Sequence, residues 1–312
     1  MPMSIIIHGH KSTQGKTTSD YKKSKMKMKG NKTMKKTSKK AIYAEYGIEY
    51  KAGKINSPLF GWIRPLLVNG NEKIGKGCYH FSTLPTNRTY IIEIDGTTYD
   101  VQGTCPCTCI NEKTGKTACY ATKGNYNFKS VLRSLAKKTM LCYNDLSFVE
   151  RAIMAQIKAD EIKLCRIHAA GDFFSVKYAE MWAKIASENP NVTFWTYTKN
   201  KKAEHVFDEL KNANIVKSFL PNGKMNFGHC NHIIEMYRIL KASGKRVHIC
   251  FCGIEKYAGI EPKHCTNCHS CAECDYVLFI EHSTDYEAEK DPLFPDLVKI
   301  ILAQDDETEK AA

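Results

Sequence analysis

The chain has 312 residues, of which 43% are hydrophobic and 25% are charged, and both values are ordinary for a soluble globular protein. Its 46 Lys and Arg residues outnumber 33 Asp and Glu residues, so the formal net charge is +13. No apolar run approaches the roughly 18 residues that cross a bilayer, and Ile5 to Ile7 are too few for the core of a signal peptide. These features exclude a membrane-spanning protein and predict a cytoplasmic one, made of one large domain or two small ones.

Positive charge is concentrated in residues 1–41, which hold twelve lysines and one acid, Asp20, for a net charge of +11. Residues 42–312 carry a net charge of only +2. The first stretch is rich in Lys, Ser, Thr and Gly and cannot bury enough apolar surface to fold, so we expect a disordered basic arm. Either the arm binds nucleic acid by neutralising phosphates, or it is an unspecific solvated tail. Residues 42–312 are expected to form a single cysteine-rich domain.

The first predicted elements are short strands between residues 42 and 101, which indicate a small β-rich N-terminal region. Within it, residues 90–94 and 97–101 flank Asp95-Gly96, a pair typical of a tight hairpin turn. The sequence therefore predicts a β-hairpin at this place.

Beyond a cysteine-rich loop at residues 105–119, helical and strand patterns alternate. Helices are predicted at residues 129–143, 147–159, 176–187, 203–211, 232–241 and, as part of a final helix, 297–302. Strands are predicted at residues 164–168, 192–197, 215–220, 246–251 and 276–281. Strands that recur with intervening helices pair in parallel through right-handed crossovers. The pattern favours a full or partial β/α barrel, with an open doubly wound sheet second, and both folds bind ligands where the strands end.

Fourteen cysteines without a secretory signal indicate metal ligands rather than disulfides. The strongest pattern is a run in which each cysteine follows the last by three residues: Cys265, Cys268, Cys271 and Cys274. Structural zinc sites commonly join two C-x₂-C pairs across a longer span, but here only two residues separate the pairs. The spacing favours the compact loops that hold an iron–sulfur cluster, of the 4Fe–4S type, with zinc as the alternative metal.

Further candidate ligands lie in two other places: Cys105, Cys109 and Cys119 in the loop, and Cys250 at the end of a strand. The sequence does not select four ligands from this set and leaves two metal centres open. The C-x₃-C-x₂-C signature of radical-SAM enzymes is absent, because Glu112 stands three positions after Cys109. Three cysteine ligands would leave an open iron for S-adenosylmethionine, whereas a cluster closed by four cysteines serves electron transfer or structure. The absent signature favours the closed cluster. The isolated cysteines are expected to pack in the apolar core: Cys78, Cys142, Cys165 and Cys230.

Polar residues follow one predicted strand and precede a helix, where a β/α loop presents a site. Gly171 would let a ligand approach the backbone, Asp172 would bind an amine or a ribose hydroxyl, and His168 would act as a general acid or base. The alternative is that Asp172 or Ser175 caps the helix. The next strand ends with two more candidates, which either face the same cavity or lie in a surface turn: Tyr197 and Lys199.

Several of these stretches resemble the phage gene-product-88-like family: Cys105-Pro106, Cys119 to Gly124, Arg166 to Ser175 with Tyr178 and Trp182, Tyr197 to Lys199, and the C-terminal cysteine run. They occur in the family's order and cover about residues 76–276. The resemblance implies a cluster-binding, radical-SAM-like barrel that is phage- or prophage-encoded and cytoplasmic in the infected or host cell. This chain differs from the family pattern by its Lys-rich arm, its extra Cys107 and Cys252, and the insert Asn111–Thr117.

Two functions follow as hypotheses. The first is an iron–sulfur protein with a redox, structural or radical-type oxidoreductase role, which would need an electron donor. The second is a zinc-stabilised nucleic-acid-binding protein, in which the arm supplies affinity and the cysteines order a recognition surface.

Overall fold

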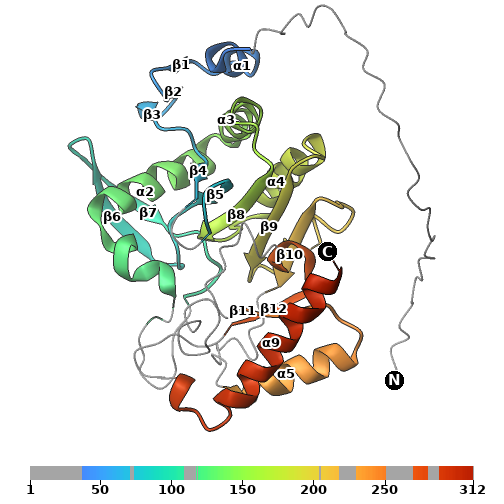
Figure 1. Ribbon diagram of the computed structural model, residues 1–312. Helices are drawn as coiled ribbons and strands as arrows, with labels where there is room; N and C mark the ends of the chain where they lie inside the picture. Colours follow the sequence, from blue (N-terminus) through green and yellow to red (C-terminus); the bar gives the residue numbers. More distant parts are fainter. Residues whose placement is uncertain are drawn as a thin grey trace, which may run out of the picture. The chain divides into compact units, whose positions relative to one another are not determined.

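The computed structural model describes residues 37–70, 74–108, 117, 119–203, 205–217, 230–250, 270–279 and 288–311 (Figure 1). They form a mixed α/β fold with several sheets, as predicted. The predicted arm lies outside the described residues up to position 36. After it, Ser38 caps helix α1 (Lys39–Glu45) by accepting a hydrogen bond from the Ala41 backbone N–H. Along the part of the chain that the structure describes, no helix is both long and apolar enough to cross a bilayer.

The central sheet has five strands in the order β10-β9-β8-β5-β4. Their bounds are Val68–Asn69 for β4, Cys78–Ser82 for β5, Leu164–Ala170 for β8, Thr193–Thr198 for β9 and Ala213–Lys217 for β10. β5, β8, β9 and β10 run parallel, and β4 pairs antiparallel at one side. The carboxyl ends of four strands therefore share one edge, the usual place for a ligand site in an open α/β sheet.

Helices α2 (Lys129–Asn144), α3 (Leu146–Ala159) and α4 (Val176–Glu188) are amphipathic, and the main core lies between α3, α4 and one face of this sheet. Phe194 of β9 and Trp182 of α4 are both completely buried there. Because side chains alternate along a strand, the neighbour of Phe194, Trp195, packs in a separate cluster with Leu164. The two faces of β9 thus meet different surroundings.

The β-rich region comprises a three-stranded antiparallel sheet and the predicted hairpin. The sheet consists of β1 (Tyr50–Lys51), β2 (Lys54–Ser57) and β3 (Gly61–Ile63). The hairpin pairs β6 (Thr89–Ile94) with β7 (Thr97–Gln102), and positive φ angles of 50° at Asp95 and 84° at Gly96 fit the expected tight turn. The hairpin prediction is confirmed.

The C-terminal part has its own apolar cluster. It comprises α5 (Cys230–Ala242), β11 (Val247–Cys250), α8 (Ser270–Glu273), β12 (Tyr276–Phe279), η4 (Ala288–Lys290) and α9 (Phe294–Ala311). β11 and β12 pair in parallel, and Ile249 packs against Leu297 and Ile301 of α9. Gln304 accepts a hydrogen bond from the Ile249 N–H at 3.1 Å and donates one to its carbonyl at 2.9 Å.

Most predicted elements agree with the structure, but two segments differ. The predicted helix at 203–211 is wrong, because the described residues there form successive short turns closed by backbone bonds such as Val206 N–H to Ala203 O. The start of the predicted β-rich region is helical, as α1 extends to Glu45. No sheet closes into a barrel within the described ranges. The remaining short helices are η1 (Tyr120–Thr122) and η2 (Gly124–Asn127).

Candidate functional site

Two buried threonines join the carboxyl ends of β5 and β8. The hydroxyls of Thr83 and Thr104 lie 2.8 Å apart, and the Asp172 N–H donates to the Thr104 hydroxyl at 3.1 Å. Gly171 packs directly on this pair: a Cβ there would lie 1.9 Å from the Thr83 hydroxyl oxygen, and its φ is +86°. Gly171 is therefore required by a close approach within the protein, where the sequence predicted an approach by a ligand.

Asp172 is buried and each of its carboxylate oxygens accepts hydrogen bonds. Oδ1 accepts from the Thr198 hydroxyl and the Phe173 N–H, both at 2.7 Å, and Oδ2 accepts from the Lys199 N–H at 2.8 Å. Burial raises the pKa of this carboxyl, against the effect of these donors. Asp172 thus joins the end of β8 to the end of β9, while Ser175 caps α4 by accepting from the Tyr178 N–H.

His168 lies within an irregular part of β8 and is also buried. The register between β5 and β8 shifts there, since Arg166 pairs with His80 but Ala170 pairs with Ser82. Such a bulge changes the direction of side chains. The His168 ring nitrogens lie 3.1 Å from the Tyr178 hydroxyl and 3.3 Å from the Thr196 hydroxyl. Burial first, and the charge of Arg166 second, lower the pKa of His168 to about 3, so the ring is neutral at pH 7.

A second group forms around Tyr197 on the other face of β9. The Tyr197 hydroxyl donates to Cys271 Sγ at 2.6 Å, and its pKa is raised by burial and by the nearby thiols of Cys271 and Cys250. The Arg166 guanidinium lies over the Tyr197 ring, 5.1 Å from its centroid. Asn214 of β10 holds the α8 turn in place by donating to the Cys271 and Cys274 carbonyls, each at 2.9 Å. Thiols from β11 and α8 therefore both lie near Tyr197 of β9.

Cys105 lies near Lys199 and near a second thiol, Cys119. Cys105 directly follows Thr104 in the chain and is partly buried. Burial, then the charge of Asp172, raise its pKa to about 12, with a smaller contribution from Cys119 and an opposing one from Lys199. Lys199 and Tyr197 consequently have different neighbours, and the sequence left open whether they share one cavity.

The described cysteines do not gather into one metal-binding cluster. No group of three or more Cys, His, Asp or Glu side chains suited to a metal occurs among the residues that the structure describes. Three of the predicted ligands lie outside those residues: Cys109, Cys265 and Cys268. The ten described cysteines form no disulfide with one another. The four isolated cysteines are buried, as predicted: Cys78, Cys142, Cys165 and Cys230.

Sequence reasoning missed Arg166. Its Nε donates to the His168 carbonyl at 2.9 Å, its guanidinium donates to the Tyr120 hydroxyl at 3.3 Å, and it also lies over the Tyr197 ring. The available signal was a charged residue in the middle of an otherwise apolar strand, Leu164 to Ala170. Thr104 had no such signal, because its role depends on tertiary contacts.

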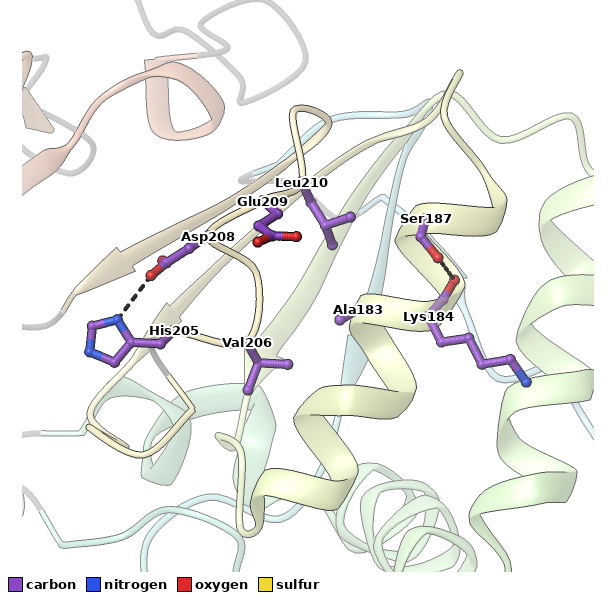
Figure 2. Close-up of a pocket in the computed structure, with 8 residues that line it drawn as sticks. All are labelled: Ala183, Lys184, Ser187, His205, Val206, Asp208, Glu209 and Leu210. Carbon is purple, nitrogen blue, oxygen red and sulfur yellow. Dashed lines mark hydrogen bonds and ion pairs between the residues drawn. The ribbon is translucent and has the colours of Figure 1, made fainter. Parts of the chain in front are cut away.

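One surface cavity, of about 530 Å³, lies apart from the predicted site residues (Figure 2). Figure 2 shows that α4 forms one wall, with Ala183 and Lys184, and that residues 205–210 form the other. Its two main polar groups already pair with each other, since His205 Nδ1 lies 2.9 Å from Asp208 Oδ2. None of the predicted site residues lines this cavity.

Comparison with known proteins gives a family. A family model described as Gene product 88 matches residues 65–250, more than half of the chain. The "Gene 88 protein" of Mycobacterium phage L5 is 49% identical over 41 residues, which are 13% of this chain and 17% of the relative. That of Mycobacterium phage D29 is 32% identical over 72 residues, or 20% of this chain and 30% of the relative. No solved structure matches significantly.

The alignments with these two curated relatives span less than a third of either relative's length. The family match is longer and runs from just before β4 to the end of β11, so it includes Cys105, Cys119 and Cys250. The C-terminal cysteine run lies beyond it. All four parallel strands, and the described loops at their carboxyl ends, fall within the matched region. The chain belongs to the Gene product 88 family.

Proposed function

We propose that this protein, phage- or prophage-encoded and cytoplasmic in the infected or host cell, binds an iron–sulfur cluster through cysteine thiolates. The observation that carries the proposal is that the Tyr197 hydroxyl bonds to the Cys271 sulfur and that Cys250 lies near the same hydroxyl. The two cysteines come from β11 and α8, which lie far apart in sequence. Thiols brought together from separate elements, without a disulfide, are the donor type that iron–sulfur clusters require.

Thiol donors fit the chemistry of an iron–sulfur cluster. Two of the proposed donors, Cys250 and Cys271, lie within the described residues. Cys265 and Cys268 belong to the same run as Cys271, so they are the proposed additional ligands, with Cys250 as the fourth. Four thiolates make a cluster anionic, and the Arg166 guanidinium over Tyr197 is the cation available to offset that charge. Cys105 and Cys119 are candidates for a second centre.

A cluster closed by four cysteines would supply one-electron transfer or structural support, with a separate electron donor in the redox case. Tyr197 would orient Cys271 and donate a hydrogen bond to its sulfur. His168 and Asp172 would act as positioning residues, because hydroxyl and amide groups already occupy their polar atoms. They would hold the ends of β8 and β9 in register.

We also infer a partial β/α barrel. β12 contacts β10, which places the β11–β12 pair next to the open side of the central sheet. Extension of the sheet through β12 would curve it toward the closed form without completing the closure. The thiols of Cys250 and Cys271 would then lie at the mouth of this partial barrel.

The test is anaerobic purification of the full chain, followed by absorbance and by iron, sulfide and zinc analysis. We expect a brown protein with broad absorption near about 400 nm and matching iron and sulfide. Cys271→Ala and Cys250→Ala should lose most of the iron. Cys165→Ala is the matched control, because Cys165 is buried in the main core, and should keep the iron content of the unmodified chain.

Circular dichroism checks that each variant folds. A colourless chain with stoichiometric zinc and no sulfide would overturn the proposal in favour of a zinc protein. Unchanged iron in folded Cys271→Ala and Cys250→Ala would remove both residues from the ligand set.

A further inference from the structure

The loops at the two ends of the parallel strands carry opposite charge. The loops that enter β8 and β10, together with the last residue of α4 before β9, contain five acids: Asp160, Glu161, Glu188, Asp208 and Glu209. The same loops contain two lysines, Lys163 and Lys211. The described loops and first helical turns that follow β5, β8 and β9, and those that follow the hairpin strand β7, are basic. Six of their residues are exposed, and we call them the basic edge: Arg88, Lys123, Lys129, Lys177, Lys201 and Lys202. Their one acid, Asp172, is buried and accepts internal hydrogen bonds.

Two residues of the basic edge lie where acids are normally preferred. Lys129 occupies the first turn of α2 and Lys177 the first turn of α4, and neither turn contains an acid. The amino end of a helix carries partial positive charge and favours anions. A lysine at each of these ends places its positive ammonium beside the partial positive charge of the helix. The arrangement therefore opposes local stability and favours an anionic partner.

Aromatic side chains are exposed beside these lysines. Tyr120 is 57% exposed, Phe128 is 60% exposed and Tyr143 is 41% exposed. The segment with Tyr120 and Phe128 reaches the end of β8, because the Tyr126 hydroxyl donates to the Ala169 carbonyl at 3.5 Å. The Tyr143 hydroxyl likewise donates to the Gly103 carbonyl at 3.4 Å, just before Thr104. Large apolar rings exposed at an edge that also carries charge provide stacking surfaces.

We propose that the basic edge binds single-stranded nucleic acid. Lysine and arginine side chains would neutralise successive phosphates, and unpaired bases would stack on Tyr120 and Phe128. The carboxylates of an acidic peptide would complement the lysines, but such a peptide has no bases to stack on the exposed rings. A duplex would keep its bases stacked on each other and away from the rings. The combination of charge and aromatic exposure therefore favours a single strand.

The test measures binding of a fluorescent oligothymidylate by anisotropy, with the full chain in every arm so that residues 1–36 are constant. Lys201→Glu/Lys202→Glu should weaken binding about 25-fold at about 0.1 M salt. It should also reduce the magnitude of the negative slope of log affinity against log salt by about 1.4, because two phosphate contacts are lost. The matched control is Lys163→Glu/Lys211→Glu at the opposite end, which changes net charge equally and should bind almost as the unmodified chain does. Phe128→Ala should weaken binding at least about fivefold, while Trp62→Ala, an exposed ring on β3, should not.

Three results would overturn the proposal: equal weakening by the two double variants, equal competition by polyglutamate, or binding that does not change in Phe128→Ala. The first would mean that overall charge alone drives binding, and the second that any polyanion suffices. The third would remove the contribution of stacking. None of these outcomes depends on whether a cluster is present.

Discussion

One lysine, Lys138, is buried in the core, where a charged side chain is unusual. Lys138 of α2 is 7% exposed, and its ammonium lies 5.5 Å from the centroid of the Phe81 ring. Burial lowers its pKa from 10.5 to about 8, slightly opposed by Cys142. Burial first, and the charge of Lys138 second, lower the pKa of the neighbouring His80 to about 4, so His80 is neutral at pH 7. Lys138 therefore destabilises the folded state at neutral pH.

Lys138→Met should raise the free energy of unfolding at pH 7 by about 1 to 3 kcal/mol. The gap between pKa values of 10.5 unfolded and about 8 folded corresponds to about 3 kcal/mol. Because the folded pKa is the lower one, this penalty is complete below pH 8 and disappears as the pH rises to 10.5. Urea unfolding should show the variant's advantage shrinking to less than about 1 kcal/mol at pH 10.

Lys137→Met is the control for this prediction. Lys137 is the adjacent lysine but pairs with Asp95 at 3.0 Å, so its replacement should not stabilise the chain. An advantage of Lys138→Met that is the same at pH 7 and pH 10 would show that packing, and not charge burial, is responsible.

At the scale of residues, sequence located the strand-end groups but not their partners. His168, Gly171 and Asp172 do lie at or next to the end of a parallel strand, as the element pattern predicts. Their contacts with Thr104, Thr198 and Tyr178 depend on chain segments brought together by the fold. A local pattern carries no information about such contacts, so it suggested ligand-binding roles for side chains that are bonded internally.

Among the elements, the first turn of α2 tests whether a lysine at the amino end of a helix lowers stability. Lys129→Glu replaces an unfavourable charge in the first turn with a favourable one, and places Glu four residues before Arg133. Both effects should stabilise the helix, by about 0.3–1 kcal/mol for the dipole and a few tenths more for the pair. Thermal unfolding should therefore rank Lys129→Glu above Lys129→Gln, and both above the unmodified chain. A loss of stability in Lys129→Glu would mean that Lys129 has a stabilising contact.

Element prediction succeeded where periodicity is long and failed where it is short. α2, α3 and α4 contain three or more turns of amphipathic pattern, and each matches its prediction closely. Residues 203–211 also carry apolar residues at helical spacing, but Ala203 and Phe207 reach the core through consecutive turns. A connection of this kind buries the same side chains without a continuous helix. Burial pattern alone cannot separate the two structures.

Across the whole molecule, two buried glutamines hold the backbone at the margins of separate sheets. Gln156 of α3 binds both the N–H and the carbonyl of Leu67, each at 2.8 Å. Gln304 of α9 binds Ile249 of β11 in the same way. A buried backbone group that loses its partner costs about 1–3 kcal/mol, so each glutamine stabilises its own region.

Gln304→Ala should therefore increase amide hydrogen exchange at residues 247–250 while leaving residues 164–170 unchanged. Gln156→Ala should change exchange around Leu67 and leave β11 unchanged, so each variant is the control for the other. Uniform acceleration along the chain in either variant would contradict two separately stabilised regions and indicate one cooperative unit.

For the molecule as a whole, the sequence predicts parallel strands in order but not how far they close. Alternating helices and strands predict that β8, β9 and β10 are neighbours, whereas β5 lies in the predicted β-rich region and its pairing with β8 was not predicted. Closure depends on the partners of β11 and β12, which pair with each other in the described structure. Cys250 ends β11 and Cys271 precedes β12, so the fold and not the cysteine spacing gives them their common neighbour Tyr197.

The separation of acidic and basic loops also determines how a partner arrives. Opposite charge at the two ends of one sheet gives the domain a dipole, and a chain of phosphates exerts a torque on it before any contact forms. Encounters would thus begin with the basic edge facing the nucleic acid, and association would be fast at low ionic strength. As ionic strength rises, the Debye length shortens to about 8 Å and this orientation at a distance is lost. The association rate constant then falls by more than the dissociation rate constant rises.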